Sequence, residues 1–82
     1  MASAQPEALM RRFEVHAAYE DRRRGHAVDG QSFEAAALAF IEAWHPAVDA
    51  DGDVSVIVTD CEDGRRQCFR IDVETGESAP CA

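Results

Sequence analysis

Apolar side chains occupy every second position in three stretches of the chain, residues 13–19, 54–59 and 68–73. A period of two is typical of a strand that buries one face. The second stretch is also rich in valine and isoleucine, which favour strands. The pattern therefore predicts three β-strands.

A fourth stretch has apolar residues at spacings of three and four, which places them on one face of a helix. They are Phe33, Ala36, Ala37, Phe40, Ile41 and Trp44. Ser32 precedes them and is a good N-cap, because its hydroxyl can accept a hydrogen bond from a free amide of the first turn. Pro46 disfavours helical geometry at His45. We therefore expect the helix to end near Trp44 or His45.

The segments around these elements carry loop signals. Residues 21–30 combine charged residues with glycines and have no lasting period, so we expect a surface loop. Residues 49–53, with the sequence DADGD, predict a turn. Residues 1–10 predict a mobile tail, and the folded domain is expected to span residues 11–77. Residues 78–82 are expected to be a C-terminal tail, with a short edge strand as the alternative.

The hairpin between the second and third strands can be tested by register, because directly opposed residues point to the same face. A type I′ turn on Asp63-Gly64 would set Val58 opposite Phe69. A type II′ turn on Gly64-Arg65 shifts the pairing by two residues and keeps the same apolar face. A three-residue loop with a bulge at Gly64 would mix core and solvent positions, so we reject it. Both tight turns stay open.

Together these elements predict an α+β fold of order β-α-β-β, a three-stranded, mainly antiparallel sheet with one helix packed on one face. Antiparallel neighbours and a right-handed helical crossover favour the strand order 1-3-2. The face under the helix is expected to carry Phe13, Val15, Val54, Val56, Val58, Phe69, Ile71 and Val73. The other face is expected to be mixed.

Composition narrows the class of partner. The chain has 82 residues, enough for one domain, and its 16 acidic and 8 basic side chains give a net charge of −8. This charge repels nucleic acid and anionic lipid, so neither is an expected partner. A core this small seldom yields more than about 3–5 kcal/mol without help. We therefore expect a homodimer or a protein partner.

The cysteines and the first residues bear on location. Cys61, Cys68 and Cys81 are an odd and sparse set, unlike the dense, even pattern of small secreted disulfide proteins. We therefore expect a reducing compartment. The first ten residues lack the basic start and apolar run of a secretory signal, and no stretch reaches the about 20 apolar residues of a membrane span. We expect a soluble, cytoplasmic protein.

An arginine triplet, Arg22, Arg23 and Arg24, interrupts the acidic character of the chain. Guanidinium groups hold phosphate or carboxylate through paired hydrogen bonds. One hypothesis is therefore an anion-binding loop with Arg70 as a further ligand. The alternative is a solvated loop whose arginines pair with nearby acidic side chains. No phosphate-binding glycine motif accompanies the triplet, so nucleotide binding is not predicted.

Both tight turns bring Cys61 and Cys68 close together across the hairpin. A redox pair, or half of a metal site with His16 as a third ligand, is one hypothesis. The six-residue spacing lacks the short knuckle of zinc sites, so structural cysteines are the preferred interpretation. The acidic run at residues 49–53 resembles a calcium loop, but Val54 stands where that loop needs glycine. No metal or cofactor is predicted.

No sequence pattern indicates an enzyme: nothing resembles a nucleophile elbow, and one helix leaves little room for an enclosed pocket. The first functional hypothesis is a small interaction module, self-associating or docking a partner through a strand edge or the outer sheet face. The residues assigned to that surface are Ile57, Thr59, Cys61 and Cys68. An anion-binding domain and a thiol or metal role are the alternatives.

Residues 32–46, SFEAAALAFIEAWHP, and 54–77, VSVIVTDCEDGRRQCFRIDVETGE, resemble small bacterial proteins of uncharacterised function. The similar blocks are a capped helix and a hairpin. The resemblance implies no activity, and no site residue is carried over from it.

Overall fold

The computed structural model describes residues 10–81, which form one α-helix, one short 3-10 helix and five strands. The elements in chain order are β1 (Arg11–Ala17), the 3-10 helix η1 (Arg22–Arg24), β2 (His26–Gly30), α2 (Phe33–Trp44), β3 (Asp53–Asp60), β4 (Arg66–Asp72) and β5 (Ser78–Pro80). The α+β class is confirmed. The mobile tail expected over residues 1–10 lies, except for residue 10, outside the described residues.

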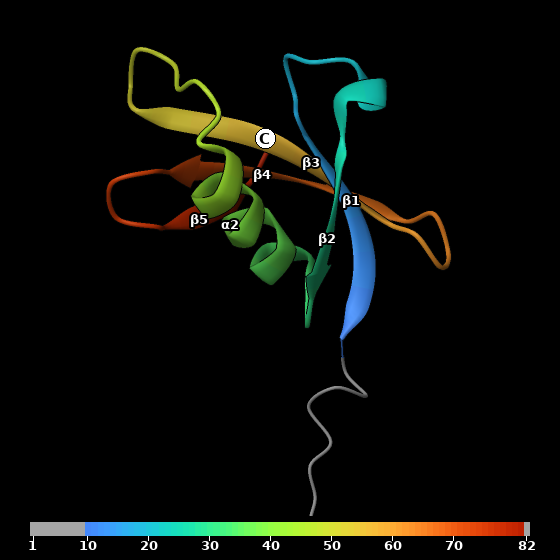
Figure 1. Cartoon of the computed structure of the whole chain (residues 1–82). Coiled ribbons are helices and arrows are strands. Elements are labelled where there is room, and N and C mark those ends of the chain that lie inside the picture. Colours follow the sequence, from blue (N-terminus) through green and yellow to red (C-terminus); the bar gives the residue numbers. More distant parts are fainter. Residues whose placement is uncertain (1–9, 82) are drawn as a thin grey trace, which may run out of the picture.

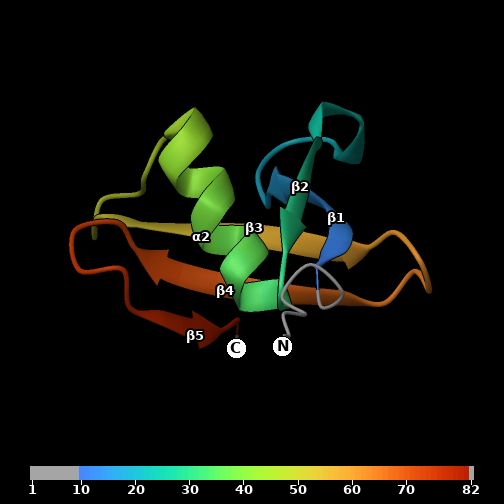
Figure 2. The ribbon, with the colours of Figure 1, turned by 60° about the horizontal axis from the view of Figure 1, so that its bottom comes forward.

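The five strands form one antiparallel sheet in the order β2-β1-β3-β4-β5. Because β1 runs antiparallel to both of its neighbours, β2 and β3 are parallel to each other, and α2 is the crossover between them (Figure 1). Figure 2 shows α2 lying on one face of the sheet. The opposite face carries no described α-helix.

The core lies between α2 and the sheet. Its buried apolar residues are Phe13, Val15, Val28, Ala36, Ala37, Phe40, Val54, Val56, Val58 and Ile71. The ring of Phe13 packs against that of Phe33, with centroids 5.0 Å apart. Alternate positions of β1 and β3 face the helix as predicted. Val73 does not, because it lies beyond the end of β4 and is 38% exposed.

The helix begins and ends where the sequence predicts. Ser32 Oγ accepts a hydrogen bond from the Ala35 N–H at 3.0 Å. His45, at φ 48°, turns the chain out of the helix, and its N–H donates to Ile41 O at 2.9 Å. Trp44 stacks on His26, with centroids 4.3 Å apart, yet is 45% exposed, so it covers the rim and not the centre of the sheet. Within residues 10–81, no helix has the length and apolarity needed to cross a membrane.

The prediction of three strands in the order 1-3-2 is wrong. The predicted second strand, β3, lies between β1 and β4, and two edge strands complete the sheet. The loop expected over residues 21–30 is instead η1 followed by β2, which pairs with β1. Residues 78–80 form β5, so the edge strand and not the tail is present there.

The hairpin register also differs from both tight turns. Val56 opposes Phe69 and Val54 opposes Ile71, two residues from the type I′ register and four from type II′. The reason is a longer loop: the Asp60 N–H donates to Arg65 O at 2.8 Å, and residues 61–64 lie beyond that bond. A shift by an even number of residues keeps every side chain on its face. The predicted apolar face is therefore present although both predicted turn types are wrong.

Candidate functional site

Tyr19 lies in the turn after β1, not in the strand as predicted. Its hydroxyl accepts a hydrogen bond from the Ala47 N–H at 3.0 Å, and the Tyr19 O–H donates to Ala47 O at 3.4 Å. The two bonds join the turn after β1 to the segment between α2 and β3. The side chain is held in place at its tip although Tyr19 is 61% exposed.

The acidic turn at residues 49–53 is ordered by Asp49. Its Oδ1 accepts hydrogen bonds from the N–H groups of Asp51 and Asp53, at 2.9 and 3.0 Å. The hydrogen bond from Asp53 N–H lowers the pKa of Asp49 most; burial opposes it, and Asp51 N–H and Arg70 lower it further. Asp49 is therefore a carboxylate at neutral pH.

Arg70 of β4 is held by all three carboxylates of this turn. Its Nε donates to Asp53 Oδ2 at 3.0 Å, and its Nη2 donates to Asp49 Oδ2 at 3.1 Å and to Asp51 Oδ2 at 3.5 Å. Three carboxylates against one guanidinium leave an excess of two negative charges. The surroundings of Arg70 consequently favour cations over anions.

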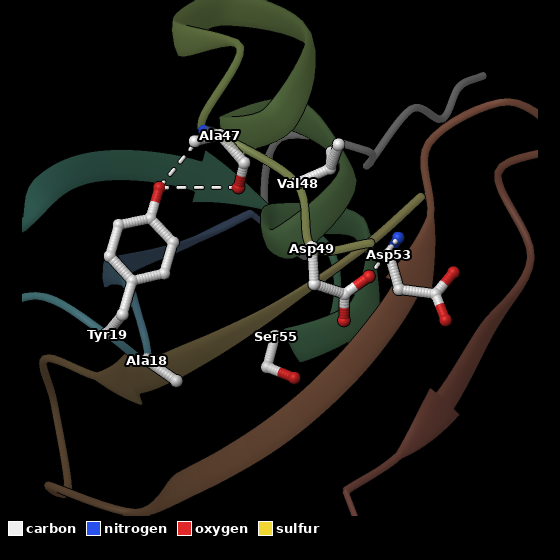
Figure 3. Close-up of a pocket in the computed structure, with 7 residues that line it drawn as sticks. All are labelled: Ala18, Tyr19, Ala47, Val48, Asp49, Asp53 and Ser55. Carbon is white, nitrogen blue, oxygen red and sulfur yellow. Dashed lines mark hydrogen bonds between the residues drawn. The ribbon is translucent and has the colours of Figure 1, made fainter. Parts of the chain in front are cut away.

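A cavity of about 460 Å³ opens between Tyr19 and the acidic turn. It is lined by Ala18, Tyr19, Ala47, Val48, Asp49, Asp53 and Ser55. Figure 3 shows Tyr19 on one side of this cavity and Asp49 and Asp53 on the other. The volume falls within the about 300–1,000 Å³ of small-molecule sites. The cavity thus combines an apolar, aromatic wall with a wall formed by two acidic residues, of which Asp49 directs its carboxylate toward Tyr19.

The model of a family of unknown function, DUF5961, matches residues 11–82. The chain belongs to this family. The comparisons with curated proteins and with solved structures gave no match. The expected similarity to an uncharacterised family is confirmed, and the family assigns no activity to the cavity.

In this DUF5961 member, the residues of the hypothesised anion site lie on different elements. Arg22 pairs with Glu14 (Nε to Oε1, 3.5 Å), and Arg23 pairs with Asp21 (Nη2 to Oδ2, 3.4 Å). Hydrogen bonds from the backbone and then the side chain of Arg23 lower the pKa of Asp21. No ion pair or hydrogen bond among the described residues joins the triplet to Arg70. Two of the three arginines are therefore paired with acidic side chains, although the triplet forms a 3-10 helix and not the expected loop.

The structure places three of the four residues assigned to an interaction surface on one face of the sheet and the fourth in a loop. Ile57 and Cys68 are opposed on the sheet face away from α2, where both are half-buried. Thr59 lies on the same face but is only 5% exposed. Cys61 lies in the hairpin loop as an exposed free thiol.

The expected closeness of Cys61 and Cys68 is wrong, because the long hairpin loop moves Cys61 beyond the paired residues. Cys68 instead forms a disulfide with Cys81, with Cα atoms 5.3 Å apart. His16, the hypothesised third metal ligand, is 4% exposed and its Nδ1 has no hydrogen-bond partner among the described residues. No group of three potential metal ligands comes together in residues 10–81.

The sequence pattern singles out only some of the residues that line the cavity. The pattern singles out the acidic run at 49–53, but as a failed calcium loop. Tyr19 continues a strand pattern, and Ala47 and Val48 carry no signal at all. The one clue is that the only tyrosine of the chain stands at the predicted end of a strand.

Proposed function

We propose that this chain is a small, non-catalytic binding domain whose cavity takes a small organic cation of the alkylammonium class. The observation that carries the proposal is the cavity itself, which has Tyr19 on one side and Asp49 and Asp53 on the other. Figure 3 shows the carboxylate of Asp49 on the side toward Tyr19 and that of Asp53 pointing away from it. An alkylammonium ion has an apolar chain for the first wall and a charged head for the second.

The charges of the whole chain and of the acidic turn, and the tyrosine ring, all favour a cationic ligand. The chain carries a net charge of −8, which raises the local concentration of cations. The turn carries three carboxylates and Arg70 one positive charge, so two negative charges remain. A tyrosine ring also attracts a cation placed within about 6 Å of its face. An anion would meet repulsion in the same place.

A matched pair of ligands tests whether the cavity binds cations or anions. We expect n-butylammonium chloride to shift the amide resonances of residues 18–19 and 47–55 in a saturable NMR titration. Sodium butyrate, which has the same apolar chain and the opposite charge, should leave them in place. Butyrate or phosphate shifting residues 21–26, with no response to butylammonium, would overturn the proposal in favour of the arginine loop.

A matched pair of variants tests whether the acidic residues that line the cavity bind the ligand. Asp53→Asn removes the negative charge of a residue that lines the cavity, and we expect it to weaken butylammonium binding by about tenfold, or 1.4 kcal/mol. Asp51→Asn makes the same charge change in the same turn at a side chain that is 80% exposed and outside the lining. It should weaken binding by less than about threefold. Equal losses in both variants would show a diffuse charge effect and no defined site.

A second candidate is the predicted interaction module, with a second copy of this chain on the open sheet face. Ile57 and Cys68 oppose one another on that face and are both partly exposed. Half-buried Ile57 lies opposite His16. Light scattering over a concentration series should then show a dimer that Ile57→Lys abolishes. A monomer at every concentration removes this candidate.

The cytoplasmic location remains a prediction. Reducing compartments keep thiols reduced, whereas the structure pairs Cys68 with Cys81. Trapping thiols at the moment of cell lysis, followed by mass spectrometry, would give the fraction of the pair that is reduced. A reduced pair would support the cytoplasmic location, and a fully oxidised pair would count against it.

A further inference from the structure

β5 is a small attachment at the edge of the sheet. It has three residues, opposed to three residues of β4 between Phe69 and Ile71. Its third residue, Pro80, has no N–H to donate. Ala79 and Pro80 are exposed, and no residue of β5 belongs to the buried core.

Few contacts outside the short ladder hold β5 in place. The Asp72 N–H donates to Glu77 O at 2.9 Å before the strand, and the Cys81 N–H donates to Cys68 O at 3.0 Å after it. The Ser78 hydroxyl also hydrogen-bonds to the carboxylate of Glu34 on α2. These groups lie near solvent, where such bonds contribute little to stability.

Among the described residues, the disulfide is the one covalent link between β5 and β4 besides the chain segment that connects them. Cys68 lies inside β4, and Cys81 follows β5 immediately. The bridge therefore links the two strands at the far end of the ladder from the turn that connects them. Both cysteines are half-buried, and neither belongs to the buried core.

We infer that the Cys68–Cys81 disulfide is a reversible clamp, and that its reduction detaches residues 77–81 and leaves β4 as the free edge of the sheet. In this step a dithiol reductant attacks the bridge and forms its own disulfide. The S–S bond of the protein breaks, and Cys68 and Cys81 each gain one proton, so two electrons and two protons pass from the dithiol to the protein.

The rest of the fold does not depend on contacts with β5. All buried core residues come from β1, β2, α2, β3 and β4. The ladder between β3 and β4 has seven opposed pairs, from Asp53 with Asp72 to Thr59 with Arg66. The released state is therefore a four-stranded sheet under the same helix, not an unfolded chain.

Hydrogen exchange at single amides, followed by NMR, tests the clamp. We expect dithiothreitol to make the amides of Asp72 and Cys81 exchange at least about tenfold faster. The amide of Asp60, bonded to Arg65 O in the hairpin, should change less than about twofold. Unchanged exchange at Asp72 and Cys81 overturns the inference, and so does a uniform acceleration that includes Asp60.

Variants separate the bridge from other effects of the reductant. The double variant C68S/C81S should show the fast exchange at Asp72 without dithiothreitol. C61S removes the exposed free thiol and leaves the bridge intact, so it should respond to dithiothreitol as the natural chain does. A C68S/C81S protein with the exchange pattern of the oxidised chain contradicts the clamp.

Discussion

Asp49 and Asp21 are carboxyls whose local hydrogen bonds change their ionisation. The N–H of Asp53 makes the largest contribution at Asp49, and the N–H of Arg23 makes it at Asp21. Each bond favours the carboxylate and lowers the pKa in the folded chain. The carboxylates therefore stabilise the fold above the unfolded pKa of about 3.9, and this contribution is lost as pH falls from there through the lowered values.

The corresponding prediction is a shift in titration midpoint. Carboxyl ¹³C resonances of Asp49 and Asp21 should titrate at lower pH than aspartate in a short unstructured peptide. The urea midpoint of unfolding should decrease over the same acidic window. Both groups are exposed to solvent, so we expect the direction and only a small size. A midpoint at or above that of the peptide would contradict the hydrogen-bond assignment.

Arg70 gives a second prediction at the level of one side chain. Exposed ion pairs contribute about 0–1 kcal/mol, so Arg70→Gln should cost about 1 kcal/mol or less in urea unfolding. It should also tighten butylammonium binding, because the turn then carries three uncompensated carboxylates. Arg66→Gln, on the same strand and with no ion pair recorded in the described residues, is the control. Weaker binding in Arg70→Gln would show that the guanidinium belongs to the ligand site.

Among the elements, α2 ends on an unfavourable residue. His45 adopts φ 48°, a conformation that costs L-residues roughly 1–2 kcal/mol and glycine little. His45→Gly should therefore raise the free energy of unfolding by about 0.5–1 kcal/mol. Ala43→Gly, two residues earlier in the helix and also exposed, should lower it by about 1 kcal/mol. Urea unfolding of both variants checks the pair, and equal signs would contradict the proposed conformation at His45.

The elements that the sequence predicts well are those with local signals. The helix has a long apolar stripe and caps at both ends, and β3 has an uninterrupted period of two. β2 has only Val28 as a large apolar residue, with Asp29 and Gly30 after it, so its strand character depends on pairing with β1. β5 is too short for a period to exist. Both edge strands are products of tertiary structure.

The strand order and the cavity belong to the whole molecule. β1 was expected to be separated from β3, yet it pairs with it, because the crossover starts from β2. A strand the sequence does not reveal therefore changes the order of all the others. The cavity joins Tyr19 to Ala47 across 28 positions, and no pattern within either segment encodes that contact. Only the acidic turn, whose hydrogen bonds are local, could be predicted as a unit.

Phe13 lies where three other elements, β2, β3 and α2, meet β1. It is fully buried on β1, opposes Val28 of β2 and Asp60 of β3, and packs on Phe33 of α2. Phe13→Ala should therefore cost about 3–5 kcal/mol, a large part of the roughly 5–15 kcal/mol that stabilises a typical folded domain.

The control for this last variant is Trp44→Ala. It removes a larger ring that is 45% exposed and stacks on His26 and on Phe40 near the end of the helix, so it should cost clearly less, about 1–2 kcal/mol. Circular dichroism during urea unfolding compares the two variants directly. If the tryptophan variant proved the less stable, the core would be centred under the end of the helix. The five-stranded arrangement around Phe13 would then be wrong.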